Sequence, residues 1–116
     1  MELQKIQKVI DDGGDLWEAL FGASKDGMLL AVQKLLTQAD IKVNQANTEG
    51  QTPLFAASQN GHVDTVQALL AHADIKVNQA SNRGETPLYV ASIKGHVDTV
   101  QTLLAHADIQ ADNNGL

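Results

Sequence analysis

The stretch TPLFAASQNGHVDTVQALLAHADIKVN, residues 52–78, is followed by a second copy of most of itself. Thr52-Pro53-Leu54 recurs as Thr86-Pro87-Leu88, and Gly61-His62-Val63-Asp64 recurs as Gly95-His96-Val97-Asp98. Both pairs are offset by 34 residues (86 − 52 and 95 − 61), so the register does not slip between them. A fixed period of this length is the signature of a repeat architecture, in which one supersecondary unit is stacked several times.

A third copy lies nearer the amino terminus. The leucine pairs Leu35-Leu36, Leu69-Leu70 and Leu103-Leu104 keep the offset of 34 twice over (69 − 35 and 103 − 69). One period before Thr52-Pro53-Leu54-Phe55 the chain reads Glu18-Ala19-Leu20-Phe21, which keeps the apolar pair and lacks Thr-Pro. The first unit is therefore a divergent edge copy of the other two.

Each unit is predicted to contain a helix, a short turn, a second helix and a long polar loop. Thr52 and Pro53 start the first helix, because a threonine oxygen caps a helix and proline at the first helical position loses no hydrogen bond. The second helix follows Gly61, and its apolar residues recur at the three-and-four spacing of one buried face. These residues are Val63, Val66, Leu69 and Leu70. The loop of residues 74–85 contains the turn-forming cluster Ser81-Asn82-Arg83-Gly84 and is predicted to be a hairpin.

The order Thr-Pro-Leu-aromatic-x-Ala, Gly-His, Val-x-x-Leu-Leu and Ala-Asp-x-x-Val-Asn resembles the ankyrin repeat, over roughly residues 15–112. The resemblance implies an all-α solenoid of about three helix-turn-helix plus hairpin units, preceded by an N-terminal capping helix. Within a single domain of residues 1–116, the expected parts are the capping helix 1–14, repeats at 15–47, 48–81 and 82–112, and a frayed tail at 113–116. The period is one residue longer than the usual 33, and Phe55 and Tyr89 stand where the family usually has histidine.

The amino-terminal segment is interpreted as half of a repeat. Its apolar residues Leu3, Ile6, Val9 and Ile10 form a stripe at helical spacing. The offset from Val9 to Leu35 is only 26 (35 − 9), so no hairpin fits between this helix and the first unit. Asp15, with Glu18 three residues on, is predicted to form a capping box that starts the next helix.

Size and composition limit the class of protein. A chain of 116 residues with 43% hydrophobic side chains suits one compact unit. The formal net charge of −6 disfavours binding to a phosphate backbone, so we expect no nucleic-acid partner. The absence of cysteine excludes disulfides and thiolate chemistry. Since the amino end lacks the unbroken apolar stretch of a signal peptide or membrane span, we expect no membrane partner and a cytoplasmic location.

Differences between the repeats indicate a binding face. Twelve of 34 positions differ between residues 45–78 and 79–112. Six of these differences fall in the predicted hairpin and first helix, surfaces that line the concave recognition groove in the family that the chain resembles. The six are Thr48/Asn82, Glu49/Arg83, Gln51/Glu85, Ala56/Val90, Gln59/Ile93 and Asn60/Lys94. A protein partner is expected on one ridge made of Glu49, Gln51, Gln59, Asn60, Arg83, Glu85, Tyr89, Ile93 and Lys94, with Tyr89 and Arg83 as anchors. The alternative is that these differences are neutral changes at exposed positions, although other positions expected to be exposed, such as Asp64/Asp98, are identical in the two units.

The first unit carries three apolar residues where the later units are polar. Trp17 aligns with glutamine and glutamate, Met28 with two histidines, and Leu30 with two aspartates. Exposed, these residues would bind a partner or join two copies in a homodimer; alternatively they pack under the N-terminal helix as core. An engineered or excised chain, in which the exchanges are deliberate, is also compatible with this pattern.

No catalytic, cofactor-binding or metal site is predicted. His72-Ala73-Asp74 and His106-Ala107-Asp108 have metal-ligand chemistry, but their duplication in register favours loop structure over two equivalent sites. Ser58 with His62, and Ser92 with His96, form no triad because no third carboxylate stands out. Gly13-Gly14 is flanked by acidic residues that would repel phosphate, so no nucleotide cofactor is expected. The function predicted is a non-catalytic interaction module, with a self-associating scaffold as the alternative.

Overall fold

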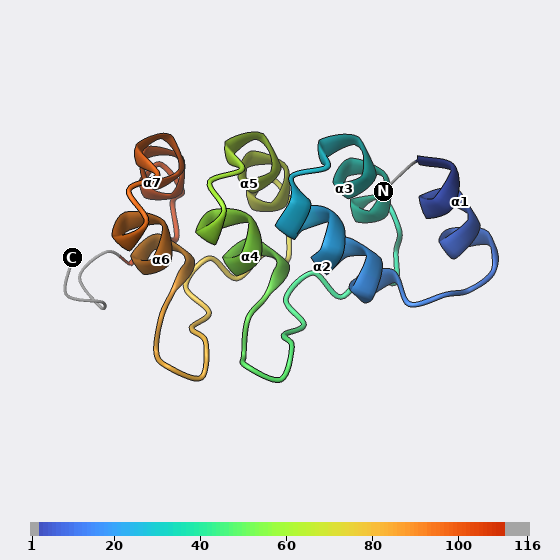
Figure 1. Ribbon diagram of the computed structural model, residues 1–116, viewed down its shortest axis with the longest axis horizontal. Helices are drawn as coiled ribbons and strands as arrows, with labels where there is room; N and C mark the ends of the chain where they lie inside the picture. The colour runs from blue at the N-terminus through green and yellow to red at the C-terminus, as the bar shows by residue number, and fades with distance from the viewer. Residues whose placement is uncertain (1–2, 111–116) are drawn as a thin grey trace.

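The structure, a computed structural model, describes residues 3–110, and this part of the chain contains seven helices. They are α1 (Leu3–Asp11), α2 (Leu16–Asp26), α3 (Leu29–Leu36), α4 (Pro53–Gln59), α5 (Val63–Leu70), α6 (Pro87–Ile93) and α7 (Val97–Leu104). After α1 they form three stacked pairs, α2 with α3, α4 with α5, and α6 with α7 (Figure 1). Since no strand occurs between residues 3 and 110, the predicted all-α solenoid is confirmed.

The helix pairs form two rows that run along the molecule. Figure 1 shows α2, α4 and α6 in one row and α3, α5 and α7 in the other, with the long loops before α4 and α6 projecting from the side of the first row. Each helix of a pair packs on its partner, and the corresponding helices of neighbouring pairs pack on one another. Because these helices have only two to three turns, they depend on their neighbours for stability.

The helix starts follow the predicted capping chemistry. Thr52 Oγ1 accepts a hydrogen bond from Phe55 N at 3.1 Å, and Thr86 Oγ1 accepts from Tyr89 N at 3.2 Å. In both helices proline occupies the first position. Asp15 Oδ1 accepts from Glu18 N at 3.0 Å and caps α2 in the same way, which supplies one of the two bonds of the predicted capping box. The first helix of every unit is thus started by a side-chain oxygen.

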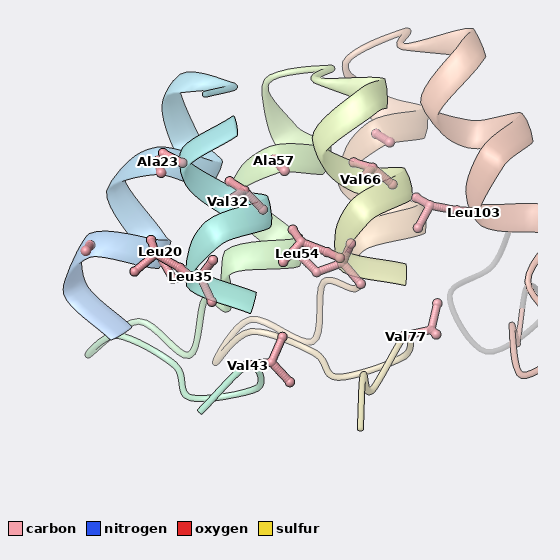
Figure 2. Close-up of a cluster of buried hydrophobic side chains, with 14 of the residues drawn as sticks. Leu20, Ala23, Val32, Leu35, Val43, Leu54, Ala57, Val66, Val77 and Leu103 are labelled. Atoms are coloured by element: carbon pink, nitrogen blue, oxygen red, sulfur yellow. The ribbon is translucent and has the colours of Figure 1, made fainter. Parts of the chain in front are cut away.

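The core is one continuous apolar layer between the two rows. Figure 2 shows Leu20, Leu35 and Leu54 directed into this layer. The same layer extends through Val66 to Leu103. The repeated leucines Leu69 and Leu103 are fully buried, as the periodicity predicts. Full burial of one such side chain stabilises the fold by about 1.5–3 kcal/mol, so each unit contributes to the stability of the next.

The loops between the pairs are hairpins that bond to one another. Their tips are closed by the bonds from Asn47 N to Gln51 O and from Ser81 N to Glu85 O. At the base of the loops, Asn44 donates through Nδ2 to Asp74 O at 2.7 Å and accepts through Oδ1 from Lys76 N at 2.8 Å.

The next loop repeats this arrangement. Asn78 Nδ2 donates to Asp108 O at 2.7 Å, and Asn78 Oδ1 accepts from Gln110 N at 3.0 Å. Each of these asparagines therefore holds the following loop through two hydrogen bonds.

The amino-terminal helix α1 packs against α3 and α2. Ile6 is fully buried there, and Val9 and Ile10 pack on the same core. The linker at Gly13-Gly14 takes the place of a hairpin, in line with the short spacing of the sequence. The expected frayed tail, residues 113–116, lies outside the described residues. No helix between residues 3 and 110 is long and apolar enough to cross a membrane.

Candidate partner-binding site

A groove of about 670 Å³ lies between the second and third units. Its walls are the two hairpin tips together with the outward faces of α4 and α6. The lining residues are Thr48, Glu49, Gln51, Gln59, Ser81, Asn82, Arg83, Glu85, Val90, Ile93 and Lys94. We call this the inter-repeat groove.

The structure brings seven of the nine predicted ridge residues together around this groove. These are Glu49, Gln51, Gln59, Arg83, Glu85, Ile93 and Lys94. Residues up to 45 positions apart in the sequence (94 − 49) thus share one surface, because the 34-residue period places equivalent positions of neighbouring units side by side. Seven of the twelve positions that differ between the two units contribute a residue to this face, whereas the shared leucines form the core.

Two of the predicted residues do not line the groove. Asn60 is exposed at the end of α4, and its Nδ2 donates to the carbonyl oxygen of Lys25 at 3.0 Å, so its side chain links the first two units. Tyr89 is half-buried in the first turn of α6. Their role in partner binding therefore stays a prediction without support from the groove.

Four lining residues were absent from the predicted ridge: Thr48, Ser81, Asn82 and Val90. The signal for Thr48, Asn82 and Val90 was present, since these positions differ between the two units. Ser81 also differs from its counterpart Asn47, but its place at the turn favoured a purely structural interpretation.

The groove is polar at the tips and apolar toward α6. Ile93 is 57% exposed, and Val90 beside it is almost buried. Ser81 Oγ accepts from Arg83 N at 3.2 Å and fixes the backbone of the hairpin tip. The basic side chains of Arg83 and Lys94 balance the carboxylates of Glu49 and Glu85 along the lining. An accessible apolar residue surrounded by charges of both signs has the composition of a protein-binding surface.

The two hairpin tips are also joined to each other. Asn82 N donates to Glu49 O at 2.9 Å, and Asn82 Nδ2 donates to Thr48 O at 2.9 Å. The side walls of the groove therefore form one bonded block rather than two independent loops.

The three apolar residues of the first unit have different surroundings. Leu30 is 64% exposed at the start of α3 and is not covered by α1. Met28 is partly buried and packs on the core. Trp17 is half-buried, donates through Nε1 to Gln45 O at 2.7 Å, and lies 5.4 Å from Phe21 between ring centroids. Trp17 lines two cavities to which neither Met28 nor Leu30 contributes.

The histidines of the Gly-His motif join neighbouring units. His62 Nε2 lies 2.9 Å from Lys25 O, and His96 Nε2 lies 2.9 Å from Gln59 O. Ser92 Oγ, for its part, donates to Leu88 O within its own helix at 2.7 Å. These hydrogen bonds give each group a structural role in the stack.

The His-Ala-Asp segments close their own loops. His72 Nδ1 accepts from Asp74 N at 3.1 Å, and His106 Nδ1 accepts from Asp108 N at the same distance. The duplication in sequence thus corresponds to a duplicated turn. Within residues 3–110, no group of three or more His, Cys, Asp and Glu side chains is placed to hold a metal ion.

The comparisons with known proteins agree with this architecture. A family model described as ankyrin repeats, in three copies, matches residues 20–113. A comparison with curated proteins finds no significant match. Ankyrin repeats are generally protein–protein interaction modules, and the family is typically non-enzymatic. With three stacked helix pairs, projecting hairpins and a family match over most of its length, the chain belongs to the ankyrin-repeat family.

Proposed function

We propose that this chain is a non-catalytic, cytoplasmic binding module that holds a protein partner in the inter-repeat groove. The observation that supports the proposal is the distribution of sequence differences. Seven of the twelve positions that differ between the second and third units place at least one of their two residues in the groove lining, while the leucines that the units share build the core. A surface that varies on a constant frame is how solenoid proteins acquire distinct partners.

The lining suggests how a partner would be held. Ile93 supplies an exposed apolar contact at the edge of α6, and Arg83 presents a guanidinium at the hairpin tip. Arginine pairs with carboxylates through two parallel hydrogen bonds and is enriched at interface hot spots. We therefore expect a partner segment with an apolar side chain near an acidic one.

The test exchanges groove residues for those that the preceding unit carries. In the variant Arg83→Glu, Ile93→Gln and Lys94→Asn, each new residue is the one at positions 49, 59 and 60, so the frame is preserved. Partners captured by the unaltered chain should bind this variant at least tenfold more weakly, measured by titration calorimetry. In the complex, hydrogen exchange should slow over residues 82–94.

A matched control changes exposed positions on the opposite row. Gln67→Ala and Gln101→Ala alter side chains of α5 and α7 that are exposed and outside the groove, and they should leave affinity unchanged. Equal weakening by both sets, or protection confined to α5 and α7, would contradict the proposal.

The exposure of Leu30 favours self-association as a second candidate. An exposed leucine at a position where the other units have aspartate is suited to contact a second copy. Light scattering at high protein concentration should then report a dimer that Leu30→Asp converts to monomer. A monomer at all concentrations would eliminate this candidate and leave the groove proposal intact.

A further inference from the structure

We propose that a second cavity, at Trp17 on α2, binds a large apolar side chain of a peptide segment that also carries basic residues. It is a shallow depression that is open to solvent, with a volume of about 680 Å³ and a lining that is mainly carbon. It lies among Val9, Asp15, Trp17, Glu18, Phe21 and Lys25, and we call it the Trp17 cavity. The inference rests on the proposed function in one respect, because it treats the same face of the repeats as the recognition face.

The repeat register relates this cavity to the inter-repeat groove. The positions two repeat periods (68 residues) after Trp17, Gly22 and Lys25 are Glu85, Val90 and Ile93, all of which line the groove. The two sites thus use the same positions of different units. What differs is the chemistry, because the first unit places aromatic carbon where the third places a carboxylate.

The cavity has a rigid aromatic wall. The rings of Trp17 and Phe21 are 5.4 Å apart between centroids and inclined by 43°. Trp17 Nε1 donates to Gln45 O at 2.7 Å, so its polar atom is already satisfied and its orientation is fixed by the following loop. A ring held in place before a ligand arrives loses little conformational entropy on binding.

The cavity exists because the first unit lacks a preceding hairpin. Gly13-Gly14 leads directly from α1 to α2, and Gly14 lines the cavity. The aromatic residue at the equivalent position of the second unit, Phe55, is 2% exposed, whereas Phe21 is half-buried. The first unit therefore leaves aromatic surface accessible that the second unit covers.

The charges of the lining select the occupant. The carboxylates of Asp15 and Glu18 belong to the lining and are exposed, against one ammonium group, that of Lys25. The chain as a whole carries a formal charge of −6, which attracts basic segments and repels acidic ones. An apolar side chain flanked by lysine or arginine matches both the apolar wall and the acidic side of the cavity.

The tryptophan provides a direct readout, since it is the only one in the sequence. The blocked tripeptide Lys-Phe-Lys should bind saturably, change the fluorescence of Trp17 and shift its indole N–H resonance. Lys-Ser-Lys and Glu-Phe-Glu should bind at least fivefold more weakly. Comparable affinity for Glu-Phe-Glu, or no response at Trp17, would overturn the proposal.

Variants with repeat-compatible residues test the geometry. Trp17→Gln introduces the residue found at position 51 and should abolish binding of Lys-Phe-Lys. Because this variant lacks the tryptophan signal, its binding is measured from the amide resonances of residues 21 and 22. Asp15→Ser keeps an oxygen that can cap α2 and removes the charge, so it should narrow the preference for Lys-Phe-Lys over Glu-Phe-Glu. If Trp17→Gln does not fold, the preference for Lys-Phe-Lys over Glu-Phe-Glu is measured in Asp15→Ser and in Glu18→Gln instead. An unchanged preference in both would overturn the proposal.

Two controls separate this inference from the proposed function. Leu30→Asp changes an exposed apolar residue outside the cavity and should leave tripeptide binding unchanged. The groove variant Arg83→Glu, Ile93→Gln and Lys94→Asn should also bind the tripeptide normally. Loss of tripeptide binding in either control would show that Trp17 responds to something other than occupation of this cavity.

Discussion

At the scale of single residues, the 34-residue period supplies pairs of positions that differ only in their neighbours. Gly61 and Gly95 both have a left-handed backbone, with φ of +70° and +75°. A Cβ at Gly61 would lie 2.6 Å from His96 Nδ1, in a ring that is bonded to Gln59 O. A Cβ at Gly95 would meet no heavy atom of the described residues within 4 Å. The two glycines therefore separate backbone strain from steric contact.

We expect Gly95→Ala to lower the free energy of unfolding by about 1–2 kcal/mol, the penalty for a left-handed non-glycine residue. Gly61→Ala should lower it by roughly a further 1–3 kcal/mol, because the added methyl group displaces the histidine that joins the second and third units. Urea denaturation of both variants measures the difference. Equal losses would mean that the His96 ring moves aside without cost.

At the scale of elements, the single helix α1 stands in the place that a complete helix pair would occupy next to the first unit. Ile6 is fully buried against the core, with Val9 and Ile10 packed beside it, while Leu3 on the same helix is 44% exposed. The sequence predicted the helix and its apolar stripe. The resulting cavity at Trp17 was not predictable, because the 26-residue spacing of α1 differs from the repeat period and gives no register for its position.

Ile6→Ala should destabilise the protein by about 2–5 kcal/mol, as expected for truncation of a buried side chain that leaves a cavity. Leu3→Ala should change stability by less than about 0.5 kcal/mol, as is usual for exposed positions. Thermal unfolding followed by circular dichroism distinguishes the two. A small effect at Ile6 would mean that α1 is not needed to cover the first unit.

At the scale of the whole molecule, the two ends of the solenoid are finished differently. The amino-terminal end is covered by α1, whereas α7 has no helix beyond it within the described residues. Val66 in α5 is fully buried and its counterpart Val100 in α7 is only half-buried. Val97 and Leu104 are likewise 63% and 47% exposed. Since each unit is stabilised by its neighbours, local stability should fall toward α7.

Native-state hydrogen exchange should show this gradient. Amides in α5 are expected to exchange at least tenfold more slowly than the equivalent amides in α7, because opening of α7 breaks contacts on one side only. Identical exchange rates in the two helices would indicate that the three units unfold as one cooperative block.

How much of this organisation the sequence predicts depends on repetition. The threonine caps, the buried leucines and the hairpins were predictable because each occurs at least twice in register, and seven of the nine ridge residues do line one groove. Asn60 was placed on the ridge because it varies, but its amide bonds to Lys25 O across the boundary between units. Leu30 and Met28 had no equivalent apolar residue for comparison, so their unlike exposure could only come from the three-dimensional packing.

The paired hydrogen bonds of Asn44 and Asn78 have a consequence for the kinetics of recognition. Since each amide holds the following loop through both its oxygen and its nitrogen, adjacent loops cannot splay apart without losing two bonds at once. If a partner binds in the groove as proposed, we therefore expect the backbone to change little and only side-chain rotamers to adjust. Complex formation should then proceed at the rate of oriented diffusional encounter, without a slow unimolecular phase.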